Sequence, residues 1–120
     1  MVTNHTKQIL IASHVEIATT AHARRIGLLK HDRLETGHAL CIPARAWIPF
    51  IAIHTFGMKF PIDVLFLDKH NQVIRCCTLP QNRIAWAWGA RMVLETAIGA
   101  IEYSRTSHSD RIEFQGEYRR

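Results

Sequence analysis

The segment from Ile62 to Asp68 constrains the fold more than any other part of the chain. Its side chains alternate between two faces of an extended strand, and both faces are largely apolar. A strand of this kind is typical of the interior of a sheet that is covered on both sides. The turn residues Asp68 to Asn71 then predict a hairpin whose second strand runs from Gln72 to Leu79.

The remaining pattern predicts short strands separated by turns and few helices. Further strands are expected at Ile9 to Ile17, His38 to Ile42, Trp47 to Ile53, Arg91 to Thr96 and Arg111 to Phe114, and short helices at Ala21 to Leu29 and Ala97 to Ser104. The 120 residues leave room for one hydrophobic core. We therefore predict a single domain over residues 1–120 with a mainly β (α+β) sandwich or barrel-like fold. It should hold about six or seven strands and one or two short helices.

Two features of the sequence indicate the cellular compartment, namely its three cysteines and the lack of a long apolar run. The number is odd and Cys76 adjoins Cys77, which makes a poor disulfide framework and favours reduced thiols. The apolar run within Gln8 to Ala12 is too short for a signal peptide or a membrane span. These features predict a cytoplasmic protein without a membrane partner.

The net charge of +5 would permit contact with a polyanion. The basic residues are scattered along the sequence, as at Arg24, Arg25 and Lys30, and form no compact run. A solvated basic surface is therefore favoured over a nucleic-acid interface.

Asp63 and His54 are the residues most able to carry chemistry. Asp63 lies at the entrance of a buried strand, where an unpaired carboxylate would be costly. It either pins the preceding loop by accepting hydrogen bonds or faces a ligand or a transferred proton. His54 could act as a base, a metal ligand or a hydrogen-bond donor.

Trp86 and Trp88 are spaced by two and would project from one face of an extended segment. They could stack on a sugar ring or a base, or they could be core residues at the rim of the sheet. The sequence holds no metal-ligand spacing, nucleophile elbow or phosphate-binding glycine loop. No metal and no cofactor are therefore predicted.

Several motifs together resemble the family called domain of unknown function 192. They are Arg25-Ile26-Gly27-Leu28-Leu29, Gly37-His38-Ala39-Leu40, His54-Thr55-Phe56-Gly57-Met58, Pro61-Ile62-Asp63, Phe66-Leu67-Asp68, Val93-Leu94-Glu95 and Gly99. The resemblance covers about residues 10–115 and implies a compact β fold without an established activity. The closing Gly-Asp of the family reads Ser109-Asp110 here, which puts the role of that glycine in doubt.

Three hypotheses for function follow. The first is a small-ligand-binding or accessory domain whose polar pocket lies at the junction from His54 to Asp63. Its candidate lining residues are Arg25, His54, Thr55, Met58, Asp63 and Glu95. The second is a hydrolase or lyase that uses Asp63 and His54 as an acid–base pair. The third is an interaction module that presents Trp86 and Trp88 to a protein, glycan or nucleic acid. The identity of the small molecule or protein partner and the oligomeric state stay open.

Overall fold

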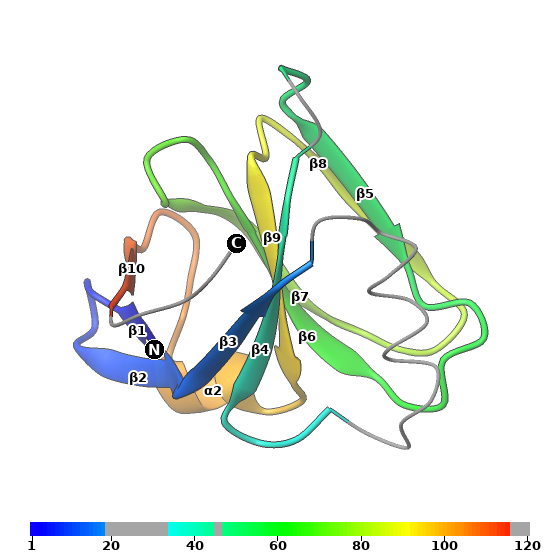
Figure 1. Ribbon diagram of the computed structural model, residues 1–120, viewed down its shortest axis with the longest axis horizontal. Helices are drawn as coiled ribbons and strands as arrows, with labels where there is room; N and C mark the ends of the chain where they lie inside the picture. Colours follow the sequence, from blue (N-terminus) through cyan, green and yellow to red (C-terminus); the bar gives the residue numbers. More distant parts are fainter. Residues whose placement is uncertain (19–33, 45–46, 116–120) are drawn as a thin grey trace.

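The computed structural model describes residues 1–18, 34–44 and 47–115, which form ten strands and one short helix (Figure 1). The elements are β1 Val2–Asn4, β2 Ile9–Ala12, β3 His14–Ile17, β4 His38–Pro43, β5 Phe50–His54, β6 Ile62–Leu67, β7 Val73–Leu79, β8 Ile84–Trp88, β9 Met92–Ala97, α2 Ala100–Ser104 and β10 Ile112–Phe114. The helix predicted at Ala21 to Leu29 lies outside the described residues.

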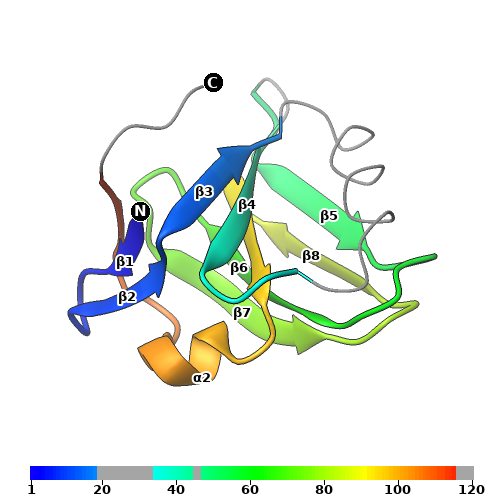
Figure 2. The same cartoon turned by 60° about the horizontal axis from the view of Figure 1, so that its bottom comes forward.

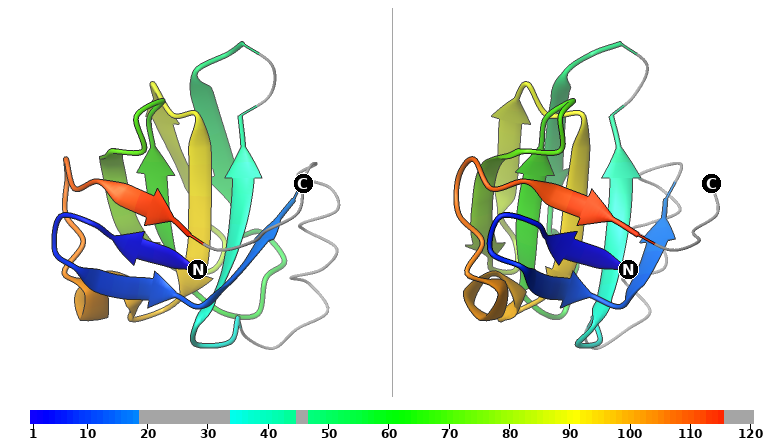
Figure 3. Two further views of the ribbon diagram at one scale, coloured as in Figure 1. Left: turned by 60° about the vertical axis from the view of Figure 1, so that its left-hand side comes forward. Right: turned by 90° about the vertical axis from the view of Figure 1, so that its left-hand side faces the viewer.

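A five-stranded sheet in the order β3-β4-β9-β6-β7 forms the centre of the molecule. Its neighbours are antiparallel except for the parallel pair β3 and β4. The small sheet β10-β1-β2 crosses one face of the central strands (Figure 3). The antiparallel pair β5 and β8 forms a third, two-stranded sheet, which Figure 2 shows beside the opposite face.

β6 is an interior strand, as its two apolar faces predict. It pairs with β9 on one side and β7 on the other, and all six of its residues are buried. The predicted turn closes the hairpin with β7, because Asp68 Oδ1 accepts hydrogen bonds from the backbone N–H groups of His70 at 2.8 Å and Gln72 at 3.0 Å. Asn71 adopts the left-handed conformation, with φ at 60°.

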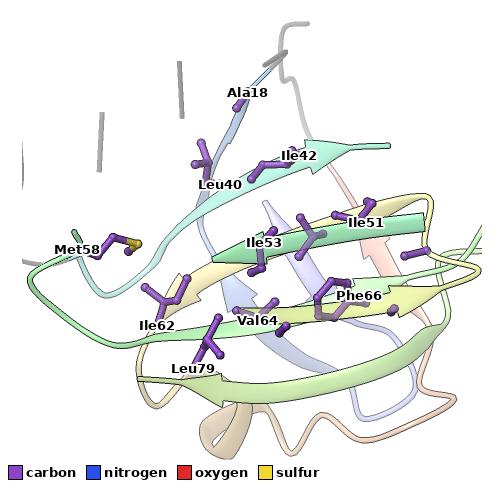
Figure 4. Packing of buried hydrophobic residues seen from close by; sticks show 14 of the residues in the cluster. Ala18, Leu40, Ile42, Ile51, Ile53, Met58, Ile62, Val64, Phe66 and Leu79 are labelled. Carbon is purple, nitrogen blue, oxygen red and sulfur yellow. The ribbon is translucent and has the colours of Figure 1, made fainter. Parts of the chain in front are cut away.

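One hydrophobic core lies between the central sheet and the β5–β8 pair, and we call it the β5–β8 core. Figure 4 shows Ile51 and Ile53 of β5 gathered with Val64 and Phe66 of β6. The remaining buried members of this core are Ala18, Leu40, Ile42, Met58, Phe60, Ile62, Leu79, Ala85, Ala87, Ala90 and Val93. Full burial of a valine, leucine, isoleucine, phenylalanine or methionine side chain in this core stabilises the fold by about 1.5–3 kcal/mol.

A second core lies under the small sheet, and we call it the β1–β2 core. Val2, Ile11 and Ile112 pack there with Leu65 and Leu94 from the other face of the central sheet. The two cores explain why β6 must be apolar on both sides, since each face of the strand contributes to one of them.

A buried polar network fixes the small sheet to the loop before β10. Asn4 Nδ2 donates to Asp110 Oδ2 at 2.9 Å and to Thr106 Oγ1 at 3.1 Å. Lys7 Nζ contacts the same carboxylate at 2.8 Å. The network therefore connects the first residues of the chain with the loop that leads into the last strand.

The mainly β fold class is confirmed, whereas the number of strands exceeds the six or seven that were predicted. No strand was predicted at Ile84–Trp88, which forms β8. β1 was missed because its three residues Val2, Thr3 and Asn4 carry no alternation long enough to recognise. The segment from Ile9 to Ile17 divides into β2 and β3 at Ser13, because the backbone N–H groups of Ser13 and His14 both donate to Gly37 O. Within the described residues, no helix combines the length and the hydrophobicity that a membrane span requires.

Candidate functional site

Asp63 is buried and its carboxylate is occupied by three hydrogen bonds. Oδ1 accepts from Thr78 Oγ1 at 2.7 Å, and Oδ2 accepts from the backbone N–H groups of Gly99 and Ile101, each at 3.0 Å. The last two groups belong to the start of α2, where backbone donors lack partners within the helix. The carboxylate therefore holds α2 and β7 against β6. The hydrogen-bond partners of Asp63 therefore lie in β7 and at the start of α2. From the sequence, we instead expected them in the loop that precedes β6.

Thr55 ties together the loops at the ends of β5 and β8. Its Oγ1 donates to Pro80 O at 2.6 Å and accepts from Arg83 N at 3.0 Å. Its backbone N–H donates to Arg83 O at 2.9 Å. The side chain is fully buried, so it positions the start of β8 and is not open to a ligand.

His54 lies on the outer face of β5, because the alternate residues Ile51 and Ile53 face the β5–β8 core. Its Nδ1 accepts a hydrogen bond from Phe56 N at 3.2 Å, and the two rings lie 4.9 Å apart. Met58 follows in the same loop but points into the β5–β8 core. The loop thus sends His54 outward and Met58 inward.

The five described residues among the six predicted to line one pocket do not converge on a single site. Glu95 is fully buried on β9, on the face that carries Val93 of the β5–β8 core. Asp63 occupies the opposite face of the central sheet, with Leu65 of the β1–β2 core. Arg25 lies outside the described residues. Apolar side chains therefore separate His54 from Asp63, and the structure does not form the acid–base pair.

An exposed apolar surface covers the outer side of the β5–β8 pair. In register, Phe50 lies opposite Trp88, Ala52 opposite Trp86 and His54 opposite Ile84, so these six side chains share one side of the ribbon. We call this surface the aromatic face. Large hydrophobic side chains on and beside it are exposed to an unusual extent, namely Ile84 at 52%, Trp86 at 50%, Trp88 at 73%, Phe56 at 47%, Trp47 at 81% and Ile48 at 45%.

The sequence predicted the shared orientation of Trp86 and Trp88 but not the rest of the aromatic face. Phe50, Ala52 and Ile84 were missed because the pairing of β5 with β8 joins segments that are far apart in the chain. The alternation of large and small side chains in β8, and of buried and exposed positions in β5, could have indicated that each strand has one exposed face. In β8, exposed Ile84, Trp86 and Trp88 alternate with buried alanines.

Two ring contacts organise the tryptophans. The rings of Phe50 and Trp88 lie 4.5 Å apart at an interplanar angle of 44°. Arg75 reaches from β7, where its Nη1 donates to Trp86 O at 2.6 Å and its Cζ lies 5.9 Å from the centre of the Trp86 ring. The aromatic face is thus held in place on both strands and has a cation at its β7 side.

Two thiols near the sheet edge are poorly suited to reactivity. Cys76 faces the β1–β2 core and Cys77 the β5–β8 core, and no disulfide joins any of the three cysteines, all of which lie in the described residues. Burial raises the pKa of both thiols, and their mutual proximity raises the pKa of Cys76 further. In the part of the chain that the structure describes, no three His, Cys, Asp or Glu side chains gather as a metal site requires.

These features define a small β-rich domain that carries an exposed aromatic strand pair. The chain belongs to the DUF192 family, described as "Uncharacterized ACR", whose model matches residues 1–114. Membership was predicted from the central motif and is confirmed.

The relatives agree with the fold. A UPF0127 protein of Thermococcus sibiricus is 30% identical over 125 aligned residues, which cover 100% of this chain and 78% of the relative. The crystal structure of a proposed transcription regulator from Sinorhizobium meliloti superposes with a TM-score of 0.72 at 19% identity, covering 82% of this chain and 79% of the other. The crystal structure of a protein of unknown function from Novosphingobium aromaticivorans superposes with a TM-score of 0.70 at 16% identity, covering 83% of this chain and 74% of the other. At 16–19% sequence identity, the similarity of these two crystal structures shows a shared fold but does not show a shared function.

Proposed function

We propose that this protein is a binding module whose contact surface is the aromatic face of β5 and β8, and that its partner is another protein. The observation that carries the proposal is the exposure of Trp86 and Trp88 beside Ile84 on one ordered strand. A contiguous apolar surface in contact with water is costly to maintain and typically marks a site of interaction.

The composition of the surface favours a protein partner. Tryptophan, phenylalanine and arginine are enriched at the centres of protein interfaces, and tryptophan and arginine often supply most of the binding free energy. Exposed aliphatic side chains such as Ile48 and Ile84 accompany the rings here. They fit an apolar protein surface better than they fit the hydroxyl groups of a glycan.

The surface is also well ordered before binding. The ring contact of Phe50 with Trp88 and the hydrogen bond from Arg75 to Trp86 O restrict both strands. A preorganised surface loses less conformational entropy on association. The aromatic face is therefore suited to binding without a large rearrangement of the ribbon.

The two other hypotheses receive less support. The described candidate residues for a small-ligand pocket face different cores or the solvent, and both oxygens of Asp63 already accept hydrogen bonds. A proton-transfer role would require His54 within about 3.2 Å of its partner or one water away. We therefore place binding by the aromatic face above catalysis.

The proposal can be tested with a photo-crosslinking amino acid placed at position 88 in the native cells. Position 103 supplies a matched control, because Trp88 and Tyr103 are each 73% exposed. Tyr103 lies on α2, on the far side of the molecule from β5 and β8 (Figure 1). We expect a discrete protein adduct at position 88 that is absent at position 103 and is reduced by Trp86→Ala. Equal, diffuse labelling at both positions would contradict the proposal.

A further inference from the structure

The two stretches of sequence that supply the aromatic face contain no acidic residue. None of the ten acidic residues of the chain lies between Glu35 and Asp63, and none lies between Asp68 and Glu95. These two intervals are separated by the β6 strand in sequence, but each supplies one strand of the β5–β8 pair. The fold therefore assembles the aromatic face from the two longest acid-free stretches of the chain.

Two exposed arginines of the stretch between Asp68 and Glu95 lie on or beside the strands of the aromatic face. The Arg75 guanidinium lies over the Trp86 ring and uses one N–H group on Trp86 O, which leaves its other donors for a partner. Arg83 immediately precedes Ile84, and both of its backbone polar groups bond to Thr55. Its side chain is exposed, with Nη1 donating to Asn82 O at 3.2 Å. Arg75 thus lies against the aromatic face itself, and Arg83 supplies a second exposed cation at the start of β8, next to Ile84 in the chain.

We propose that the partner presents an acidic protein surface, with Asp or Glu side chains placed around an apolar centre. This inference rests on the proposed function and adds the charge of the partner to it. Complementary charge around an apolar interface raises the association rate and rejects partners of the wrong sign. Arginine also forms bidentate hydrogen bonds with carboxylates, which adds geometric selectivity.

The same charges disfavour two other occupants. A second copy of the chain related by two-fold symmetry would bring cationic borders together, since such an interface pairs a surface with itself. A single-stranded nucleic acid could stack on Trp86 and Trp88. However, its affinity would depend on a row of phosphate contacts, and the apolar centre between Arg75 and Arg83 includes the aliphatic Ile84.

The test compares soluble probes that differ only in charge or chemical class. A random copolymer of Glu and Tyr serves as the acidic, partly apolar probe, and a copolymer of Lys and Tyr is its charge-inverted control. Oligo(dT) supplies a nucleic acid. Affinity is measured by calorimetry at low ionic strength, because salt screens exposed charges.

Two double variants separate local charge from net charge. Arg75→Glu with Arg83→Glu changes the border of the aromatic face. Arg105→Glu with Arg111→Glu makes the same change in net charge at exposed positions beside α2 and β10. We expect the Glu–Tyr copolymer to bind the wild-type protein. Its affinity for the Arg75→Glu, Arg83→Glu variant should be about tenfold weaker, and its affinity for the Arg105→Glu, Arg111→Glu variant should equal that for the wild type. The Lys–Tyr copolymer should show no binding.

Several results would overturn the inference. Three of them are equal affinity for both copolymers, an equal loss of affinity in both double variants, and tighter binding of oligo(dT) that is lost in Trp86→Ala. Absence of Glu–Tyr binding together with a specific adduct at position 88 would also overturn the acidic partner while leaving the proposed function in place. Absence of that adduct would instead remove the proposed function.

Discussion

His54 and Asp63 lie on opposite sides of the β5–β8 core. His54 projects from the outer face of β5, and Asp63 projects from the face of β6 that points toward the β1–β2 core. The central motif of the family therefore performs two separate tasks in this protein. Its first residue contributes to the aromatic face, and its carboxylate anchors α2 and β7.

Asp63→Ala should destabilise the fold without weakening binding at the aromatic face. The substitution leaves Thr78 Oγ1 and the backbone N–H groups of Gly99 and Ile101 without their acceptor. We expect the free energy of unfolding to fall by about 3 kcal/mol. Chemical denaturation measures this loss of stability. Asp63→Asn should reduce the free energy of unfolding by less, because one acceptor oxygen remains. Unchanged stability in Asp63→Ala would contradict the anchoring role.

Acid should remove a stabilising contribution that Asp110 makes at neutral pH. Burial alone would raise the pKa of its carboxyl group, but hydrogen bonds from Lys7, Asn4 and Ser107 N outweigh it and hold the pKa below its ordinary value. Because folding lowers this pKa, the contribution is complete above the ordinary carboxyl pKa of about 3.9. It is lost as the pH falls through the lower value of the folded state.

Asp110→Asn isolates this effect from the other carboxyl groups. The difference in the free energy of unfolding between wild type and Asp110→Asn should be largest at neutral pH and should shrink toward about pH 2. Urea titrations across this range measure it. A difference that is independent of pH would show that the charge of Asp110 contributes nothing.

Ser109→Gly should stabilise the protein. The backbone φ of Ser109 is 75°, which lies in the region that disfavours residues with a side chain. Relief of this strain should raise the free energy of unfolding by about 1 kcal/mol, even though Ser109 Oγ loses its contact with His108 Nδ1. Ser107→Gly should not stabilise the fold, because it removes the Ser107 Oγ contact with Asp110. A lower melting temperature for Ser109→Gly would show that the hydroxyl outweighs the strain.

The thiols should react slowly with alkylating reagents while the protein is folded. Cys41 is buried, and burial raises the pKa of both Cys76 and Cys77, which lowers the thiolate fraction near neutral pH. Labelling with iodoacetamide should therefore accelerate sharply on addition of denaturant. Rapid native labelling at Cys76 or Cys77 would contradict the packing described for β7.

The sequence predicted those parts of the fold that depend on local pattern. The two apolar faces of Ile62 to Asp68 and the turn after it correctly predicted the β6–β7 hairpin. The short strands β1 and β10 depend on each other across nearly the whole chain, through pairs such as Val2 with Phe114. β10 was predicted at Arg111 to Phe114, whereas β1 was missed because a three-residue strand has little alternation to recognise before its partner is known.

The candidate site could be predicted only in part for a related reason. The spacing of Trp86 and Trp88 predicted a shared face, but Phe50 joins them only because β5 pairs with β8. Asp63 was recognised as a buried carboxylate that needs partners. Its partners Gly99 and Ile101 could not be inferred, because they follow β9 in the chain and reach Asp63 only through the order of the central sheet.

The affinity of the protein that crosslinks to position 88, measured with the purified pair by calorimetry, tests the central claim most directly. Trp86→Ala with Trp88→Ala should weaken binding at least about a hundredfold, because buried tryptophans at an interface often contribute 2 kcal/mol or more. Tyr103→Ala, with matched exposure, should leave the affinity unchanged. Equal affinities for the tryptophan variant and the wild type would contradict the assignment of the aromatic face as the binding surface.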